Sequence, residues 1–183
     1  MAKVTTGTGD TGYTGLLGDQ RVAKYDPRPD TFGTIDEATS ALGLARASTP
    51  DPRVKEIIFH IQQDLYLLMA ELATLPENYE KMNFRITETH VKKLEEIEES
   101  LKNEVEIPNK FIVPGDTVDG AALDMARTII RRAERMAVKL LHENVIANGE
   151  VVRYLNRLSD LVFILARYRE VKSSLAHIPK STS

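Results

Sequence analysis

Several features that define large protein classes are missing from this 183-residue sequence. There is no cysteine, which excludes disulfides, thiolate metal sites and a cysteine nucleophile and favours a cytoplasmic setting. No run of about 18 apolar residues occurs and the first residues lack an apolar signal segment, so we expect neither membrane insertion nor secretion. The formal net charge of -3 argues against general nucleic-acid binding, so any site for a polyanion must be local.

Two familiar site motifs are absent as well. The glycine spacing of residues 7–14 is close to that of a Walker A loop, but Tyr13 stands where the lysine is required and no hydrophobic strand precedes it. This excludes a P-loop NTPase. The sequence has no Glu-x-x-His pair, which argues against a di-iron carboxylate bundle.

The residues that are present predict one helical domain over 1–183. Thr34 and Glu37 have the spacing of a capping box, and Asp51-Pro52 has the pattern of an N-cap followed by a proline in the first turn. Apolar residues then recur at helical spacing, which predicts five helices. Their approximate ranges are 34–47, 52–75, 88–103, 117–142 and 150–171. We divide the domain into an N-terminal loop, 1–33, a helical bundle, 34–178, and a loose tail, 179–183.

One predicted helix is unusually rich in arginine. Arg127, Arg131, Glu134 and Arg135 fall on one broad face at about 100° per residue. The opposite face is apolar and consists of Ile129, Ala133, Met136, Ala137 and Leu140. Arginine keeps its charge and offers planar forked donors, so this face suits a polyanion such as phosphate better than a general base. The alternative is an exposed face of surface ion pairs.

The N-terminal segment is rich in glycine and threonine and is predicted to be a loop. Glycines let successive backbone N–H groups turn toward an anion, and threonine hydroxyls add donors, so residues 6–14 suit a phosphate cradle. Lys24 is the nearest cation able to fold back toward a phosphate. The alternative is a chain end that binds nothing.

Three further residues have two interpretations each. Asp36 is favoured by the dipole of its predicted helix, and it is also suited to orient an arginine of another helix. Phe111 either packs in the core or lines a pocket. Asn156 lies on a polar face of the last predicted helix and either hydrogen-bonds a base or sugar or simply fills the surface.

These pieces match one known family in the same order. The matching stretches are residues 6–14, 21–24, 32–37, 111–115, 126–135 and 154–160. The chain therefore resembles the propanediol-utilisation type of ATP:cob(I)alamin adenosyltransferase over nearly its whole length. Because separated motifs in one order are far more specific than any one of them, the resemblance favours the ligand-binding interpretation in each case above.

The resemblance implies an all-α fold, a five-helix up-and-down bundle with ferritin-like packing and an N-terminal Gly/Thr-rich nucleotide loop. It also implies a homotrimer with active sites at subunit interfaces. The implied reaction moves the 5′-deoxyadenosyl group of ATP to cob(I)alamin, giving adenosylcobalamin and triphosphate, while Mg²⁺ bridges phosphate oxygens without an assigned protein ligand. Implied partners are ATP, the corrinoid, and a cob(II)alamin reductase or an adenosylcobalamin-dependent mutase, with no nucleic acid and no membrane.

The resemblance also assigns roles to individual residues, with ATP between the loop of one subunit and the arginine helix of its neighbour. The triphosphate cradle would consist of Thr6, Gly7, Thr8, Gly9, Thr14 and Lys24. The rest of the nucleotide site would consist of Arg131, Arg132, Ala133, Glu134, Arg135 and Asn156. Arg127 would pair with Asp36 across the interface, and Phe111 would occupy the lower face of the corrin and displace its dimethylbenzimidazole base. Arg131, Asp36, Arg127 and Phe111 are thus the implied catalytic residues.

The chemistry agrees with these implied roles. Cob(I)alamin is a very strong nucleophile, so attack on the 5′ carbon of ATP needs alignment and a stabilised leaving group rather than a protein base. Fixed arginines, Lys24 and a metal ion supply that stabilisation. Phe111 has no ligating atom, so it would help to keep cob(II)alamin four-coordinate, which eases its reduction to cob(I)alamin.

Two positions depart from the family pattern. Asp116 stands where a second glycine usually follows Pro114-Gly115, and Asp124 stands where a histidine is common. Either would alter the fit of the corrinoid, and neither touches the implied triphosphate contacts. Competing interpretations are a non-catalytic ATP-binding helical regulator, a structural helical oligomer and a different ATP-using transferase, none of which needs Phe111 in a corrinoid pocket.

Overall fold

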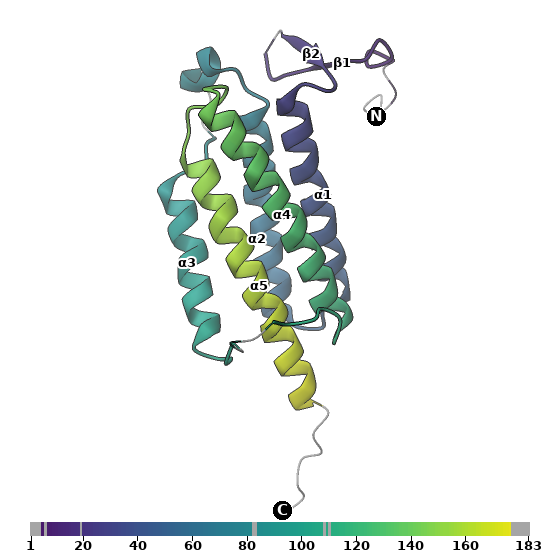
Figure 1. Ribbon diagram of the computed structural model, residues 1–183, viewed down its shortest axis with the longest axis vertical. Helices are drawn as coiled ribbons and strands as arrows, with labels where there is room; N and C mark the ends of the chain where they lie inside the picture. Colours follow the sequence, from purple (N-terminus) through teal and green to yellow (C-terminus); the bar gives the residue numbers. More distant parts are fainter. Residues whose placement is uncertain are drawn as a thin grey trace, which may run out of the picture.

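The computed structural model describes residues 5, 7–18, 20–81, 84–107, 109 and 111–176. Within this part, five α-helices run up and down beside one another, and a short β-hairpin sits at one end of the bundle (Figure 1). The prediction of five helices in a mostly helical chain is confirmed, and the short hairpin is an addition to it. The elements are β1 Tyr13–Gly15, β2 Arg21–Ala23, α1 Pro27–Ser48, α2 Pro52–Leu72, the 3₁₀ helix η1 Pro76–Lys81, α3 Glu88–Lys102, α4 Val118–His142 and α5 Glu150–Ala176.

The start predicted for the first helix is wrong by two turns. Helix α1 begins at Pro27, with Asp26 as its N-cap, and the Asp26 side chain accepts a hydrogen bond from Arg28 N at 3.0 Å. A proline in the first turn is tolerated because its missing N–H would have no partner there. Thr34 does not cap the helix: it is buried, and its hydroxyl donates to Asp30 O one turn earlier.

The starts of the next helices agree with the sequence. Asp51 caps α2 by accepting from the N–H groups of Arg53 and Val54, and Thr117 caps α4 by accepting from Gly120 N at 3.0 Å. An N-cap of this kind stabilises a helix by about 1 kcal/mol. The caps therefore fix where the chain enters the bundle, including the entry of the arginine helix.

The core lies between the helices and is lined mainly by aliphatic side chains. Helix α1 packs against α2 and α4, and α5 packs against α4 and α3. Helix α4 contributes a buried stripe that includes Ala126, Ile130, Ala133, Ala137 and Leu140. The predicted apolar face of this helix is therefore confirmed at Ala133, Ala137 and Leu140. The buried stripe also includes Ala126 and Ile130, whereas Ile129 and Met136 are only half-buried.

The N-terminal segment, predicted as a loop, contains the hairpin of β1 and β2. The hairpin is anchored to the end of α2, because Leu17 N donates to Ala73 O at 2.7 Å. The buried Arg28 reinforces this end of the bundle by donating to Thr74 O at 2.9 Å and Val145 O at 2.6 Å. The hairpin is thus held at the end where α4 finishes, away from the end where α4 begins (Figure 1).

Among the described residues, no helix combines the length and apolar character needed to cross a membrane.

Candidate functional site

The arginine face of α4 is exposed to solvent. Arg131, Arg132 and Arg135 are exposed and Arg127 is half-buried, whereas Ala133 is fully buried in the core. Arg132 pairs with Glu37 of α1, and Arg135 donates to the backbone oxygen of Arg131 at 3.0 Å. Of the predicted charged face, Arg131 and Arg135 are exposed and Arg127 and Glu134 are half-buried, so the predicted separation of faces is confirmed in part. Because the methyl group of Ala133 packs in the core, no side-chain contact with a nucleotide is assigned to it.

A hollow of about 400 Å³ lies beside this face, between α3, α4 and α5. Its apolar surface comes from Ile107, Phe163 and Ile164, and Arg127 and Arg131 bring positive charge to its edge. This volume is within the range of small-molecule sites. The hollow therefore combines an apolar surface, suited to a flat organic ring system, with guanidinium groups suited to an anion.

Carboxylates accompany these arginines. Asp160 and Glu98 line the same hollow. Burial raises the pKa of Asp160, and the neighbouring Glu98 raises that pKa further. On α4, Glu134 accepts from Asn156 Nδ2 at 3.0 Å, and Asn156 Oδ1 accepts from Arg157 at 2.8 Å. The amide of Asn156 is thus held in one orientation. The structure brings Glu134 and Asn156 together, as expected for one site.

The glycine-rich turn at the N-terminus is shaped by two basic residues. Lys24 N donates to Gly12 O at 2.9 Å, and a Cβ placed on Gly9 would lie only 3.0 Å from Lys24 Nζ. Lys24 therefore does fold back onto the turn, and glycine at position 9 leaves room for its ammonium group. Arg21 donates to Thr8 O at 2.5 Å and to Tyr13 O at 3.0 Å, which ties the turn to the hairpin. Thr6 lies outside the described residues.

Phe111 and Asp36 are both available to a ligand or a neighbouring molecule. The Phe111 side chain is 92% exposed in the segment that precedes α4, so the alternative that it is a core residue is wrong for this chain. Asp36 is exposed on α1. Within one chain, Arg127 does not pair with Asp36, because its Nε donates to Asp124 Oδ1 at 3.0 Å. That bond uses only Nε, so the two Nη atoms of Arg127 are not used by it, and Arg127 lines the hollow.

Comparison with known proteins shows the family of this chain. The family described as cobalamin adenosyltransferase matches residues 4–169. The corrinoid adenosyltransferase of Mycobacterium leprae is 40% identical over 174 residues, which cover 91% of this chain and 91% of that protein. The chain belongs to the cobalamin adenosyltransferase family. Its predicted activity, that of a transferase acting on a corrinoid, is confirmed.

Solved structures of the family agree with the fold. A variant of the PduO-type ATP:corrinoid adenosyltransferase from Lactobacillus reuteri, solved with cobalamin and ATP, is 35% identical to this chain. The two superpose with a TM-score of 0.87, over 94% of this chain and 96% of that one. A second variant of the same enzyme, with lysine in place of an arginine and solved with ATP, gives a TM-score of 0.85 at 35% identity.

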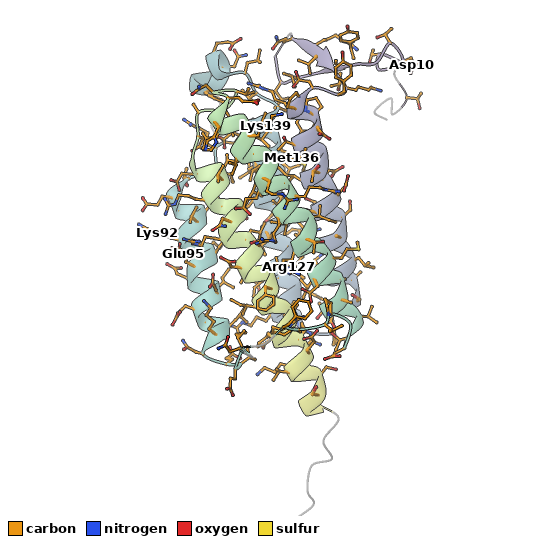
Figure 2. The ribbon with its side chains drawn as sticks, in the orientation of Figure 1. Asp10, Lys92, Glu95, Arg127, Met136 and Lys139 are labelled. Atoms are coloured by element: carbon orange, nitrogen blue, oxygen red, sulfur yellow. The ribbon has the colours of Figure 1, made fainter. Side chains whose placement is uncertain are left out.

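In this member of the cobalamin adenosyltransferase family, the two halves of the predicted site lie apart within one chain. Figure 1 shows the hairpin at one end of the bundle and the start of α4 at the opposite end. Figure 2 shows Asp10, in the glycine-rich turn, well separated from Arg127 on α4. The structure thus brings Arg127 and Arg131 to one hollow, joins Glu134 to Asn156, and separately brings together Gly9 and Lys24. It does not bring the two sets together.

The sequence alone assigns no contact to three further residues of the site. Phe163 lines the hollow, and helical spacing places it on the same face as Asn156 and Asp160, which is the signal for its position. Arg21 binds backbone oxygens and Asp124 pairs with a side chain 43 positions away, and helical periodicity gives no signal for such contacts. Among the described residues, there is no group of three or more His, Asp or Glu side chains placed to hold a metal ion.

Proposed function

We propose that this chain transfers the 5′-deoxyadenosyl group of ATP to cob(I)alamin at the hollow between α3, α4 and α5. The cobalt would attack the 5′ carbon, a cobalt–carbon bond would form, and the bond from that carbon to the triphosphate oxygen would break. The observation that carries the proposal is the juxtaposition of Arg127 and Arg131 with the apolar surface of Phe163 and Ile164 in a chain of this family.

The chain's own residues act by position and charge. Arg131 is exposed at the edge of the hollow, where its guanidinium is suited to neutralise the departing triphosphate. Asn156, held by Glu134 and Arg157, presents a fixed amide to the nucleoside. No general base is required, because the attacking cobalt carries no proton to remove. Fixed placement of the two reactants is then the main contribution of the protein.

We further propose that each site is shared by two subunits of a homotrimer. The glycine-rich turn with Lys24 would hold the triphosphate on one subunit. Helix α4 of the neighbouring subunit would supply the rest of the nucleotide site, namely Arg131, Arg132, Arg135 and Glu134, the last of which binds Asn156. Supporting this proposal, Asp10 in the glycine-rich turn lies well apart from Arg127 within one chain (Figure 2), and Asp36 is exposed on α1. Asp36 would then meet Arg127 of the neighbouring subunit.

The exposed Phe111 completes the proposed corrinoid site. Its ring carries no atom that ligates cobalt, so it would occupy the lower axial face and keep the dimethylbenzimidazole base away. Mg²⁺ would travel with ATP and be held by phosphate oxygens, without a protein ligand of its own. We also propose that the chain acts in the cytoplasm. Its proposed partners are a cob(II)alamin reductase or an adenosylcobalamin-dependent mutase.

Mixed subunits test the shared site. The Lys24→Ala and Arg131→Ala variants should each be nearly inactive, whereas co-assembled one-to-one they should regain activity. In random trimers about a quarter of the sites would combine an intact turn with an intact α4. The assay is adenosylcobalamin formation from ATP and cob(I)alamin by trimers whose mixed composition is verified by native mass spectrometry. The same variants mixed without subunit exchange serve as the control.

No recovery in verified mixed trimers would contradict the sharing of the site, and a monomeric protein would contradict the trimer itself.

A further inference from the structure

A buried carboxylate of α4 joins two arginines. Asp124 Oδ1 accepts from Arg127 Nε at 3.0 Å, and Asp124 Oδ2 accepts from Arg167 Nη2 at 2.5 Å. The Asp124 and Arg167 side chains are 4% and 3% exposed. We call this arrangement of Arg127, Asp124 and Arg167 the Asp124 bridge. It links α4 to α5 and ends at a guanidinium that lines the hollow.

The same two arginines contact one aromatic ring. The Cζ atoms of Arg127 and Arg167 lie 6.0 and 5.2 Å from the centroid of the Phe163 ring. Glu170 completes the cluster by accepting from Arg167 Nη2 at 2.9 Å. Asp124 and Glu170 together balance the two guanidinium charges. A ring contact and a carboxylate contact therefore restrict Arg127 from two sides, in a setting where a buried charge is costly to leave unpaired.

We infer that Asp124 and Arg167 are positioning residues, which hold the Arg127 guanidinium and the Phe163 ring in the orientation needed for adenosyl transfer. The inference rests on the proposed function. Its physical basis is that Asp124 fixes Nε of Arg127 and so directs the rest of its guanidinium toward the hollow and the neighbouring subunit. A long arginine side chain without that contact samples many rotamers, and small displacements of a positioning group lower the rate strongly.

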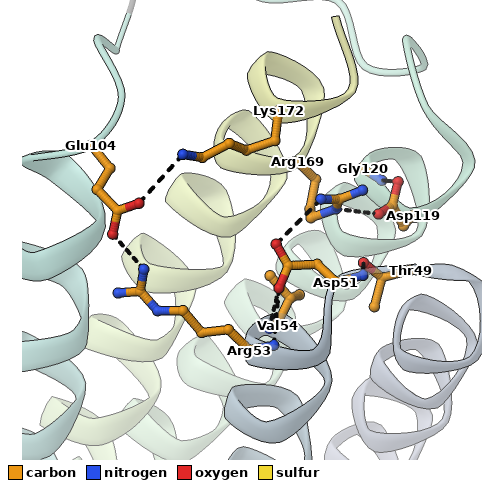
Figure 3. Close-up of polar contacts among 9 residues, drawn as sticks. All are labelled: Thr49, Asp51, Arg53, Val54, Glu104, Asp119, Gly120, Arg169 and Lys172. Atoms are coloured by element: carbon orange, nitrogen blue, oxygen red, sulfur yellow. Dashed lines mark hydrogen bonds and ion pairs between the residues drawn. The ribbon is translucent and has the colours of Figure 1, made fainter. Parts of the chain in front are cut away.

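The chain offers a matched control at the entrance to the same helix. Asp119 of α4 also pairs with an arginine of α5, since its Oδ2 accepts from Arg169 Nε at 2.6 Å (Figure 3). Arg169 Nη1 also donates to Oδ2 of Asp51, the N-cap of α2, at 3.4 Å. These side chains are 5% and 7% exposed. Burial acts to raise the pKa of Asp119, but hydrogen bonds from Arg169, Thr117 and Thr49 outweigh it and lower the pKa. This pair does not line the hollow.

The test compares Asp124→Asn with Asp119→Asn in the full protein, assayed from chemically reduced cob(I)alamin so that reduction of cobalt does not enter. Both variants should lower the melting temperature. Asp124→Asn should lower kcat/KM by about tenfold to a hundredfold, mainly through kcat, and Asp119→Asn should leave kcat/KM within about twofold of the wild-type value.

A double-variant cycle then separates positioning from stability. If Asp124 acts through Arg127, adding Asp124→Asn to Arg127→Ala should lower kcat/KM little further. Additive losses, or an equal loss in Asp119→Asn, would overturn the inference. Should Asp124→Asn not fold, Arg167→Lys weakens the bridge from its other end, and the same cycle with Arg127→Ala applies. An inactive wild-type protein would instead contradict the proposed function.

Discussion

Replacing Arg131 by alanine should lower kcat for adenosyl transfer by about a hundredfold to a thousandfold, the usual effect of removing a fixed donor from a leaving group. Arg131 is exposed at the edge of the hollow, and its side chain is not part of the core. The free energy of unfolding should therefore change by less than about 0.5 kcal/mol. Single-turnover kinetics with ATP and cob(I)alamin measure the loss, and size-exclusion chromatography with light scattering measures the assembly.

Arg153→Ala is the matched control for this substitution. Arg153 is another exposed arginine, on α5, and it pairs with Glu150 one turn earlier rather than lining the hollow. It should keep wild-type activity. A wild-type kcat in Arg131→Ala would contradict the assignment of the leaving group to the arginine face.

The second large effect is expected at Phe111. Phe111→Ala should lower turnover that starts from cob(II)alamin by at least about tenfold, while turnover from chemically reduced cob(I)alamin changes much less. The reason is that alanine no longer fills the lower axial position, so the cobalt keeps a fifth ligand and is harder to reduce. Because Phe111 is 92% exposed, its removal leaves no cavity in the core and should not alter the melting temperature.

The spectrum of bound cob(II)alamin provides a direct readout, since four- and five-coordinate cobalt differ in it. Tyr66→Ala, which removes an exposed aromatic ring from α2, is the control and should affect neither assay. Equal losses from cob(I) and cob(II) would remove the proposed role of Phe111 in displacing the base.

Much of the fold follows from local signals. Asp51 with Pro52, and Thr117 ahead of the arginine helix, mark helix starts that the structure reproduces, because an N-cap depends only on residues within one turn. The local signals near the start of α1 are misleading. Pro27 and Pro29 suggest a loop, yet both fall in the first turn of α1, where proline is tolerated. Thr34 has the sequence pattern of an N-cap, but its hydroxyl donates to a backbone oxygen one turn earlier in the same helix.

The site could be predicted only in part. Helical periodicity separates the exposed Arg131 from the buried Ala133, and the family resemblance assigns a role to each half of the site. Contacts between distant segments leave no signal in the periodicity of the sequence. Asp124 and Arg167 are 43 positions apart, and the Arg21 side chain binds the backbone oxygen of Thr8. Asp124 was recognised only as a departure from the family pattern, and the structure gives that departure a partner.

The central claim is that this chain moves the adenosyl group of ATP to a reduced corrinoid. An anaerobic reaction of the protein with ATP, Mg²⁺ and chemically reduced cob(I)alamin tests it most directly, by following the loss of the cob(I) spectrum and separating the phosphate products by chromatography. We expect adenosylcobalamin and intact triphosphate to form in equal amounts. Binding of ATP with no reaction of the corrinoid, or release of ADP or diphosphate in place of triphosphate, would contradict it.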